Sequence, residues 1–275
     1  MKTNQFFSAL FMATLYTGFI ACSDDNNNEP EVVVDVCDQM DDITFKQYCH
    51  ENFDTNKDGK VSASEADGVT QMYIEHKFIH SLKGIEVFHN LSVLKVTYND
   101  LTTLDISKCK SLTYMRCSLN EITSLIVNGC TTLTILECDG NKLTTLDVSQ
   151  CVNLFQLVCA MNKLETLNYS GCTKLKHLDC SFNNISSIDL THYPKLEGVS
   201  CRDNHLTAID ASKCPELYLL DCTNNNLTGT LDLSKCGKLN VLWSYRNPNL
   251  SEVWLKTGKV PSYLEIDNQV TAIYK

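Results

Sequence analysis

Apolar and polar residues repeat along this chain with a period of 21 residues between Leu91 and Asn247. A leucine opens each of the eight repeats: Leu91, Leu112, Leu133, Leu154, Leu175, Leu196, Leu217 and, after 22 residues, Leu239. A second apolar residue follows three positions later, a cysteine follows five positions later in six repeats, and an asparagine follows eight positions later in all eight. A fixed period of this length indicates a solenoid, in which similar segments stack along one axis.

Each repeat predicts one short strand followed by a turn. The pattern L-x-x-L-x-C-x-x-N-x-L places its apolar side chains on one side of the strand. A single repeat cannot bury that side alone, so neighbouring repeats are expected to stack. The asparagine marks the turn out of the strand, where its amide can bond to unpaired backbone groups of its own repeat and of the next one.

This repeat resembles the leucine-rich repeat family, specifically its short bacterial class. The resemblance implies an α/β or mainly β solenoid over residues 71–250, a right-handed superhelix with a parallel sheet on its concave face. In that family the concave face usually binds a partner, which is an analogy and does not follow from the spacing. Residues 251–275 depart from the pattern and predict a carboxyl-terminal cap, with closing strands around a turn at Asp267 and Asn268.

The amino terminus predicts export and lipid anchoring. Lys2 precedes an apolar run over residues 6–20, which is too short for a comfortable membrane span and fits a secretory signal. The segment Phe19-Ile20-Ala21-Cys22 resembles a bacterial lipobox. The resemblance implies removal of residues 1–21 as a lipoprotein signal peptide and lipidation of Cys22; an ordinary cleaved signal is the alternative.

Residues 22–40 predict an acidic, flexible tether, because they combine a proline with many acidic residues and asparagines. The acid-rich start of this segment resembles the surface-export signals of some Gram-negative lipoproteins, and a plain solvated tether is the alternative. The expected location is therefore the bacterial outer membrane, with the protein facing the cell exterior.

Residues 54–65 match the calcium-binding loop of an EF-hand. The expected ligands are the side chains of Asp54, Asn56 and Asp58, the backbone carbonyl of Lys60, Ser62 acting through water, and the bidentate carboxylate of Glu65. The flanking residues predict an EF-hand-like helical cap over residues 41–70. Because the sequence holds no second loop of this kind, we interpret it as a structural Ca²⁺ site that ties the tether to the first repeat. A regulatory switch and a metal-free relic are the alternatives.

The chain contains 15 cysteines, of which 12 occupy two positions of the repeat. Parallel neighbouring strands hold their Cβ vectors in an orientation that suits a disulfide poorly. We therefore predict mostly buried free thiols, and leave open a bridge between Cys37 and Cys49.

The net charge and the repeated polar residues exclude several classes of partner and activity. A net charge of −10 argues against a nucleic-acid partner and against electrostatic adsorption to an anionic membrane. Aspartates that recur two positions before a serine or threonine are expected to cap turns. No catalytic constellation stands outside these structural positions, so the protein is not expected to be an enzyme.

Binding is expected at strand positions that point away from the core. The candidate binding residues are Tyr114, Val158, Met161, Phe182, Trp243 and Tyr245. The favoured function is a monomeric, non-catalytic binding or adhesion module that presents its concave sheet to a protein or glycan. A passive envelope spacer is the alternative, and a hydrolase is a more remote one.

Overall fold

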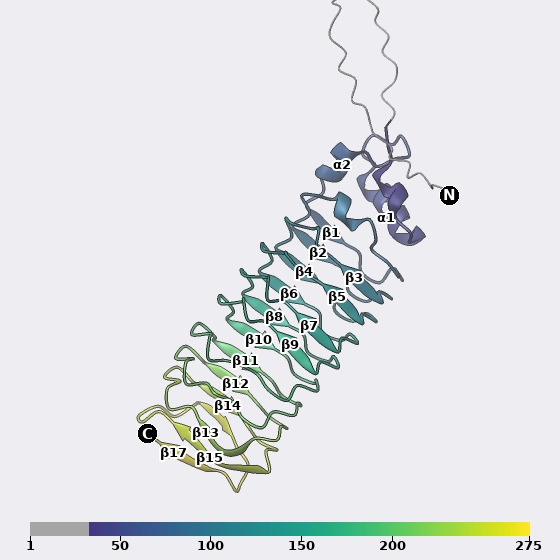
Figure 1. Ribbon diagram of the computed structural model, residues 1–275. Helices are drawn as coiled ribbons and strands as arrows, with labels where there is room; N and C mark the ends of the chain where they lie inside the picture. Colours follow the sequence, from purple (N-terminus) through teal and green to yellow (C-terminus); the bar gives the residue numbers. More distant parts are fainter. Residues whose placement is uncertain (1–32) are drawn as a thin grey trace, which may run out of the picture. The chain divides into compact units, whose positions relative to one another are not determined.

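The structure is a computed structural model that describes residues 33–275; the expected signal peptide, Cys22 and the first part of the tether lie outside the described residues. Figure 1 shows turns of chain that stack along one axis, each adding one strand to a parallel sheet. This ten-stranded sheet contains β1 (Gln71–Tyr73), β2 (Val93–Lys95), β4 (Tyr114–Arg116), β6 (Ile135–Glu137), β8 (Gln156–Val158), β10 (His177–Asp179), β11 (Gly198–Ser200), β12 (Leu219–Asp221), β14 (Val241–Trp243) and β16 (Tyr263–Glu265). The predicted parallel-sheet solenoid is confirmed.

The return segments between these strands form short strands of their own. They pair as β3 (Thr103–Asp105) with β5 (Ser124–Ile126), as β7 (Thr145–Asp147) with β9 (Thr166–Asn168), and as a three-stranded sheet of β13 (Thr228–Asp232), β15 (Asn249–Leu255) and β17 (Thr271–Tyr274). The central leucines of β3 and β7, Leu104 and Leu146, join the same core as the leucines of the main sheet.

The register of the main sheet places equivalent residues side by side. Leu136 of β6, for example, pairs with Met115 of β4 and with Leu157 of β8, and all three side chains are fully buried. Burying one such side chain contributes about 1.5–3 kcal/mol. The period in the sequence therefore becomes a continuous apolar column, which no single turn could form alone.

The asparagine row forms a ladder of buried hydrogen bonds. Asn183 is typical: its Nδ2 donates to the carbonyls of Cys180 at 3.0 Å and Cys159 at 3.1 Å, and its Oδ1 accepts the backbone N–H of Leu164 at 2.8 Å. The predicted bonding across repeats is therefore present, but it runs to the preceding repeat and not to the next one. Each asparagine side chain therefore forms hydrogen bonds within its own turn and to the preceding turn.

All 14 cysteines among the described residues are free and buried, including Cys37 and Cys49. A second row of cysteines stands three positions before the leucine that opens the next repeat. Several of these thiols donate to a carbonyl of the preceding turn, such as Cys172 to Val148 at 3.2 Å. Where the row lacks a cysteine, the Tyr193 hydroxyl makes the equivalent bond to the Tyr169 carbonyl at 2.8 Å. The cysteines thus act as small apolar side chains with a weak donor.

A small helical cap covers the amino-terminal end of the solenoid. It consists of the 3-10 helices η1 (Val36–Gln39) and η2 (Ile85–Val87) with the helices α1 (Ile43–Phe53) and α2 (Ala63–Asp67). Phe53 at the end of α1 packs edge-on against Phe88, with 5.4 Å between ring centroids. The tether was predicted to reach residue 40, but residues 36–39 are helical and Cys37 is fully buried, because this segment packs into the cap.

The carboxyl-terminal residues complete the solenoid. The two expected closing strands exist as β16 and β17, but β16 extends the main sheet beside β14 and β17 pairs with β15. Asp267, in the turn between them, accepts the backbone N–H groups of Arg246 at 2.9 Å and Asn247 at 2.8 Å. Within residues 33–275, no helix is long and apolar enough to cross a membrane.

Candidate functional site

The outer face of the ten-stranded sheet consists of the first and third residues of its strands, because the central residue points into the core. This alternation follows from the two-residue period of a strand, and seven of the ten strands show it as a buried residue between two half-buried ones. The third positions form one row across the rungs: Tyr73, Lys95, Arg116, Glu137, Val158, Asp179, Ser200, Asp221, Trp243 and Glu265. We call this the third-position row.

The structure divides the six predicted binding residues into two groups. Tyr114, Val158 and Trp243 lie on the outer sheet face, and Tyr245 follows β14 by two residues. Met161 and Phe182 lie instead in the turns that leave β8 and β10, where their backbones have φ angles of 54°. These two turn residues are the more exposed, at 60% and 47%.

A hollow of about 540 Å³ lies on the sheet face over β8, β10, β11 and β12. Gly198 provides its floor, since this position carries a side chain in every other strand of the sheet. A Cβ atom at Gly198 would approach the His177 ring to 3.3 Å. Tyr218, half exposed, stands at its margin. The glycine was not among the predicted site residues, because only coordinates show which side chains surround it.

The predicted calcium loop has the local geometry that its sequence requires. Asp54 accepts the backbone N–H groups of Asp58 at 3.2 Å and Gly59 at 2.9 Å, and Asn56 Oδ1 accepts that of Asp58 at 2.8 Å. Gly59 has a φ angle of 86°, which residues with a Cβ rarely adopt. These bonds fold the loop around its oxygen-bearing side chains, a donor set that suits a hard cation such as Ca²⁺.

Glu65 closes the loop from the first turn of α2. It accepts the backbone N–H groups of Ser62 at 2.9 Å and Thr55 at 2.8 Å, and forms a capping box with Ser62. These hydrogen bonds to the carboxylate lower the pKa of Glu65 to about 2. The Lys60 ammonium donates to the Val33 carbonyl at 2.8 Å. The residues present therefore fit a calcium ion held by Asp54, Asn56, Asp58, Lys60, Ser62 and Glu65.

The loop pairs with residues 35–36, where the chain enters the cap. Val36 donates its backbone N–H to the Val61 carbonyl at 2.9 Å, and Val61 donates its own to Asp35 Oδ1 at 3.2 Å. In paired EF-hands a second loop makes the strand contact at this position, and here residues 35–36 take that place. Sequence reasoning missed this contact, because it joins residues 25 positions apart through the fold of the cap.

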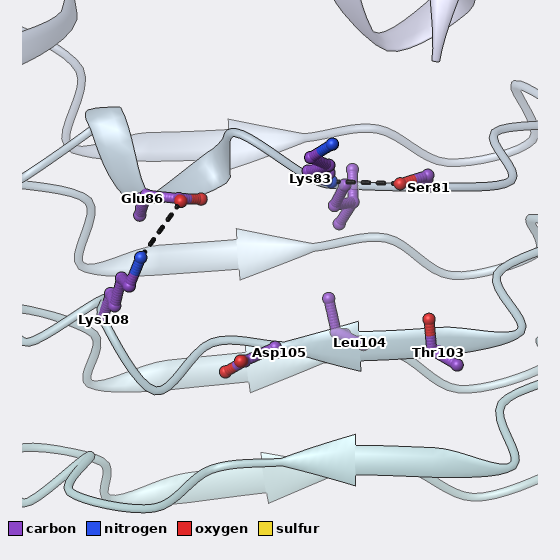
Figure 2. Close-up of a pocket in the computed structure, with 8 residues that line it drawn as sticks. Ser81, Lys83, Glu86, Thr103, Leu104, Asp105 and Lys108 are labelled. Carbon is purple, nitrogen blue, oxygen red and sulfur yellow. Dashed lines mark hydrogen bonds and ion pairs between the residues drawn. The ribbon is translucent and has the colours of Figure 1, made fainter. Parts of the chain in front are cut away.

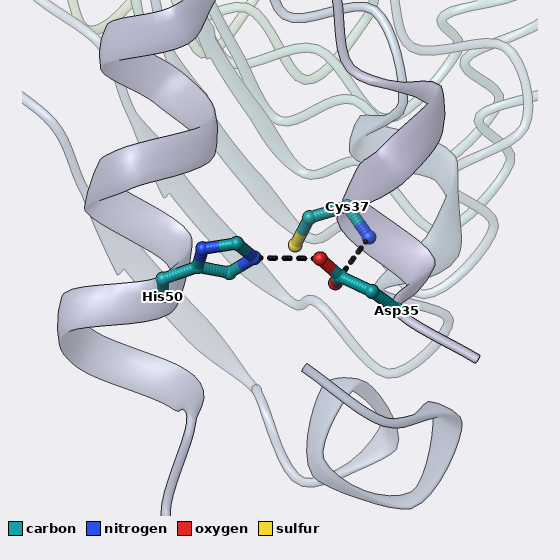
Figure 3. A group of neighbouring side chains, drawn as sticks. All are labelled: Asp35, Cys37 and His50. Carbon is teal, nitrogen blue, oxygen red and sulfur yellow. Dashed lines mark hydrogen bonds and ion pairs between the residues drawn. The ribbon is translucent and has the colours of Figure 1, made fainter. Parts of the chain in front are cut away.

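Asp35, Cys37 and His50 form a second cluster in the cap (Figure 3). His50 Nε2 lies 2.8 Å from Asp35 Oδ2, and the Cys37 backbone N–H donates to Asp35 Oδ1 at 3.0 Å. Desolvation raises the pKa of Asp35, but the hydrogen bonds from Cys37, Val61 and His50 outweigh it and lower the pKa below its usual value. The Cys37 side chain is fully buried, so no substrate can reach its thiol. The cluster joins η1 to α1 and is structural in this arrangement.

A smaller hollow of about 200 Å³ lies where the cap meets the first turns of the solenoid (Figure 2). Its polar groups bond to one another: Lys108 pairs with Glu86 at 3.5 Å, and the Lys83 backbone N–H donates to Ser81 Oγ at 3.2 Å. These pairs do not form a site with a shared ligand-binding geometry.

The aspartates of the return segments bond to nearby backbone, as predicted for turn caps. Asp147 Oδ1 accepts the Ser149 N–H at 2.9 Å, and Asp189 Oδ1 accepts the Thr191 N–H at 2.8 Å. Hydrogen bonds from Ser149 and Thr191 lower the pKa of these two carboxyl groups. Acids held ionised and exposed in this way are poor proton donors near neutral pH.

Comparison with known proteins supports the fold. No protein-family model and no curated protein matches the sequence. The functional domain of InlJ from Listeria monocytogenes, which includes a cysteine ladder, is 26% identical with a TM-score of 0.63, and the match covers 88% of this chain and 61% of that one. The leucine-rich repeat protein LIC12759 of Leptospira interrogans is 20% identical with a TM-score of 0.62, over 75% of this chain and 58% of that one.

A third solved structure shares the fold with a lower TM-score. PEPR1, solved with AtPEP1, is 20% identical with a TM-score of 0.54, over 70% of this chain and 32% of that one. The chain thus spans less than two thirds of the length of each of these structures. The parallel rungs, the asparagine ladder and these likenesses together establish that the chain has the leucine-rich repeat fold.

Proposed function

We propose that this protein is a non-catalytic binding module that presents the outer face of its ten-stranded sheet to a protein or glycan. The observation that carries the proposal is that each repeat uses separate positions for the core and for the outer face. The recurring leucines, cysteines, asparagines and aspartates are used in the core or in backbone hydrogen bonds. The outward positions carry varied, half-exposed side chains around a hollow, as in a recognition surface.

The same proposal includes attachment to the bacterial outer membrane through lipid on Cys22. Its support is the sequence: a basic residue, an apolar run and the lipobox-like segment Phe19-Ile20-Ala21-Cys22. Several acyl chains on one residue would give lasting anchorage, which a single chain does not. Metabolic labelling with a clickable palmitate analogue tests this: wild type should be labelled and Cys22→Ala should not.

We further propose that Ca²⁺ in the 54–65 loop acts as a staple. The loop follows α1 directly and is joined to residues 35–36 through Val61, so an ion there would stabilise the link between tether and solenoid. Ligand binding to the native state alone stabilises it by about 2.7 kcal/mol at a hundredfold excess over Kd.

Thermal unfolding of the full chain in calcium and in EDTA tests the staple. We expect Ca²⁺ to raise Tm in wild type and to leave it unchanged in Asp58→Ala. Asp38→Ala is the matched control, since Asp38 is an exposed acid of the same cap whose side chain pairs with Lys46 outside the loop. An equal calcium response in wild type and Asp58→Ala would contradict the proposal.

The binding proposal is tested with two double variants of the full chain. Tyr114→Ala/Trp243→Ala removes aromatic groups from the sheet face, and Met161→Ala/Phe182→Ala removes apolar groups from the turns. Binding to a panel of purified extracellular proteins and glycans should fall in the first variant and persist in the second. Loss in the turn variant alone would move the site to the turns, and no binding by wild type would favour a passive spacer.

A further inference from the structure

We infer that the carboxyl-terminal half of the sheet face binds a cationic polypeptide segment, with its positive side chains held between carboxylates of alternate rungs. This inference rests on the proposed function of the sheet face and names the chemistry of the partner. It is carried by the order of charges in the third-position row and by the hollow beside it.

Positive and negative residues separate along this row. The amino-terminal rungs carry Lys95 and Arg116, and both are already engaged within the protein. The Lys95 ammonium lies 5.3 Å from the Tyr73 ring centroid and 5.4 Å from that of Tyr114. Arg116 forms an ion pair with Glu137 at 3.2 Å. The two cationic side chains at this end of the row therefore already have partners within the protein.

In the described part of the chain, the acidic end of the row forms no ion pair of this kind: Arg202, whose charge is felt by Asp221, pairs with Asp203 at 2.7 Å and lies over the Phe182 ring. Asp179, Asp221 and Glu265 occupy every second rung of its last five strands, with Ser200 and Trp243 between them. Within residues 33–275, no lysine, arginine or histidine nitrogen lies within 4.0 Å of these three carboxylates. Asp179 and Asp221 each use one oxygen to accept a backbone N–H, from Ser181 and Thr223 at 3.0 Å. Their second oxygens remain for a ligand.

The spacing of these acids creates two slots. Neighbouring rungs lie about 4.8 Å apart, so a cation over Ser200 would stand about that distance from both Asp179 and Asp221. The short serine side chain leaves room for it. The second slot lies over Trp243, between Asp221 and Glu265, where the indole ring can also face a cation. Two carboxylates beside an aromatic ring favour a guanidinium group, which can bond to both.

The separation of the slots matches one peptide conformation. They are two rungs apart, about 9.6 Å. A polyproline II segment rises about 3.1 Å per residue and returns to the same face every third residue, about 9.3 Å along its axis. A segment with basic residues three positions apart could thus fill both slots while lying across the strands. The hollow over Gly198, with His177 and Tyr218 at its margin, would receive an intervening apolar side chain.

A fluorescent (Arg-Pro-Pro)₄ peptide tests this inference by anisotropy, with the full chain in an uncharged detergent. We expect Asp179→Asn/Asp221→Asn to weaken binding by about tenfold or more, which corresponds to about 1.4 kcal/mol. Added salt should weaken wild-type binding as well. Asparagine retains an acceptor for the N–H groups of Ser181 and Thr223, so the turn bonds can persist.

The matched control is Asp189→Asn/Asp210→Asn, which removes the same charge from the return segments. These aspartates also each accept a backbone N–H two residues on, at 2.8 Å and 2.9 Å, and the control should bind within twofold of wild type. Ser200→Lys gives an independent check: it would place an ammonium of the protein in the first slot, and should reduce binding with every carboxylate present.

Equal weakening in both double variants would show attraction to net charge and overturn the inference. Absence of wild-type binding to the peptide would overturn it too. In either case, loss of panel binding in Tyr114→Ala/Trp243→Ala would leave the broader binding proposal standing, so the two failures are distinguishable.

Discussion

Asn183 shows how one side chain serves two turns of the solenoid. Its amide bonds to the buried carbonyls of Cys159, Cys180 and Ser181 and to one buried N–H, and the residue itself is 6% exposed. Replacing it with alanine leaves the Leu164 N–H without an acceptor, at about 1–3 kcal/mol for an unsatisfied buried group. It also removes one of the two amide donors to each cysteine carbonyl, since Asn162 still bonds to Cys159 and Asn204 to Cys180. We expect Asn183→Ala to lower the free energy of unfolding by at least about 2 kcal/mol, measured with urea. Asn184→Ala is the control: its exposed amide makes only a 3.5 Å bond, so an equal loss there would contradict the ladder.

Glu65 gives a pH dependence whose sign follows from its pKa. Its folded-state pKa of about 2 lies below the ordinary value of 4.5, because N–H and hydroxyl groups bond to the carboxylate. The stability it contributes is therefore fully present above about pH 4.5 and is lost as the pH falls towards 2. In EDTA, the Tm difference between wild type and Glu65→Gln should shrink over this range. A difference independent of pH would contradict the assignment.

At the residue scale, side-chain contacts that recur in many turns could be predicted from the sequence better than contacts that occur only once. The asparagine ladder and the aspartate turn caps follow from patterns that recur in many turns. The contact of Val61 with Asp35 and Val36 occurs once and depends on how the cap folds. The hollow at Gly198 likewise depends on which side chains neighbouring rungs place around it. Neither has a signal in spacing alone.

At the element scale, the two rows of cysteines are explained by the narrow space between neighbouring turns. A thiol is small enough to pack where neighbouring strands lie about 4.8 Å apart. Burial raises the pKa of Cys159 and Cys201 well above the ordinary thiol value, which suppresses the reactive thiolate. Ellman's reagent at pH 8 should therefore react with the native protein only at the rate of unfolding, and rapidly in urea. Fast, stoichiometric reaction of several thiols in the folded protein would show that these buried thiols are accessible to solvent, which would contradict the prediction.

Elements inside the periodic region were predicted more accurately than those at its ends. The short helix α2 ends at Asp67, directly before Gly68, a residue that disfavours a longer helix. The end of the tether was wrong by several residues, since η1 owes its structure to burial of Cys37 and to Asp35 as its N-cap. The closing strands were expected together but belong to different sheets, a choice set by tertiary pairing.

At the scale of the whole molecule, a solenoid is stabilised mainly by contacts between neighbouring turns. Its ends therefore need substitutes for missing neighbours. The amino-terminal end uses the helical cap, whose core includes Phe45 and Cys49. At the other end, Asp267 bonds to the N–H groups of Arg246 and Asn247. In earlier turns a carbonyl of the following turn accepts such a group, as when Phe182 donates to Arg202 at 2.8 Å.

The Asp267 side chain thus replaces the backbone carbonyl that accepts this N–H group in earlier turns. Asp267→Ala should lower stability by about 1–3 kcal/mol, because two N–H groups lose their acceptor. Each turn of a solenoid is stabilised by the turns next to it. The loss of protection in hydrogen exchange should therefore be greatest in β14 and β16 and should decrease towards β8. Asp41→Ala, at an exposed acid in the amino-terminal cap, should leave these strands unchanged. A uniform loss of protection along the sheet in Asp267→Ala would instead mean that the solenoid unfolds as one unit, and that its ends are not separately stabilised.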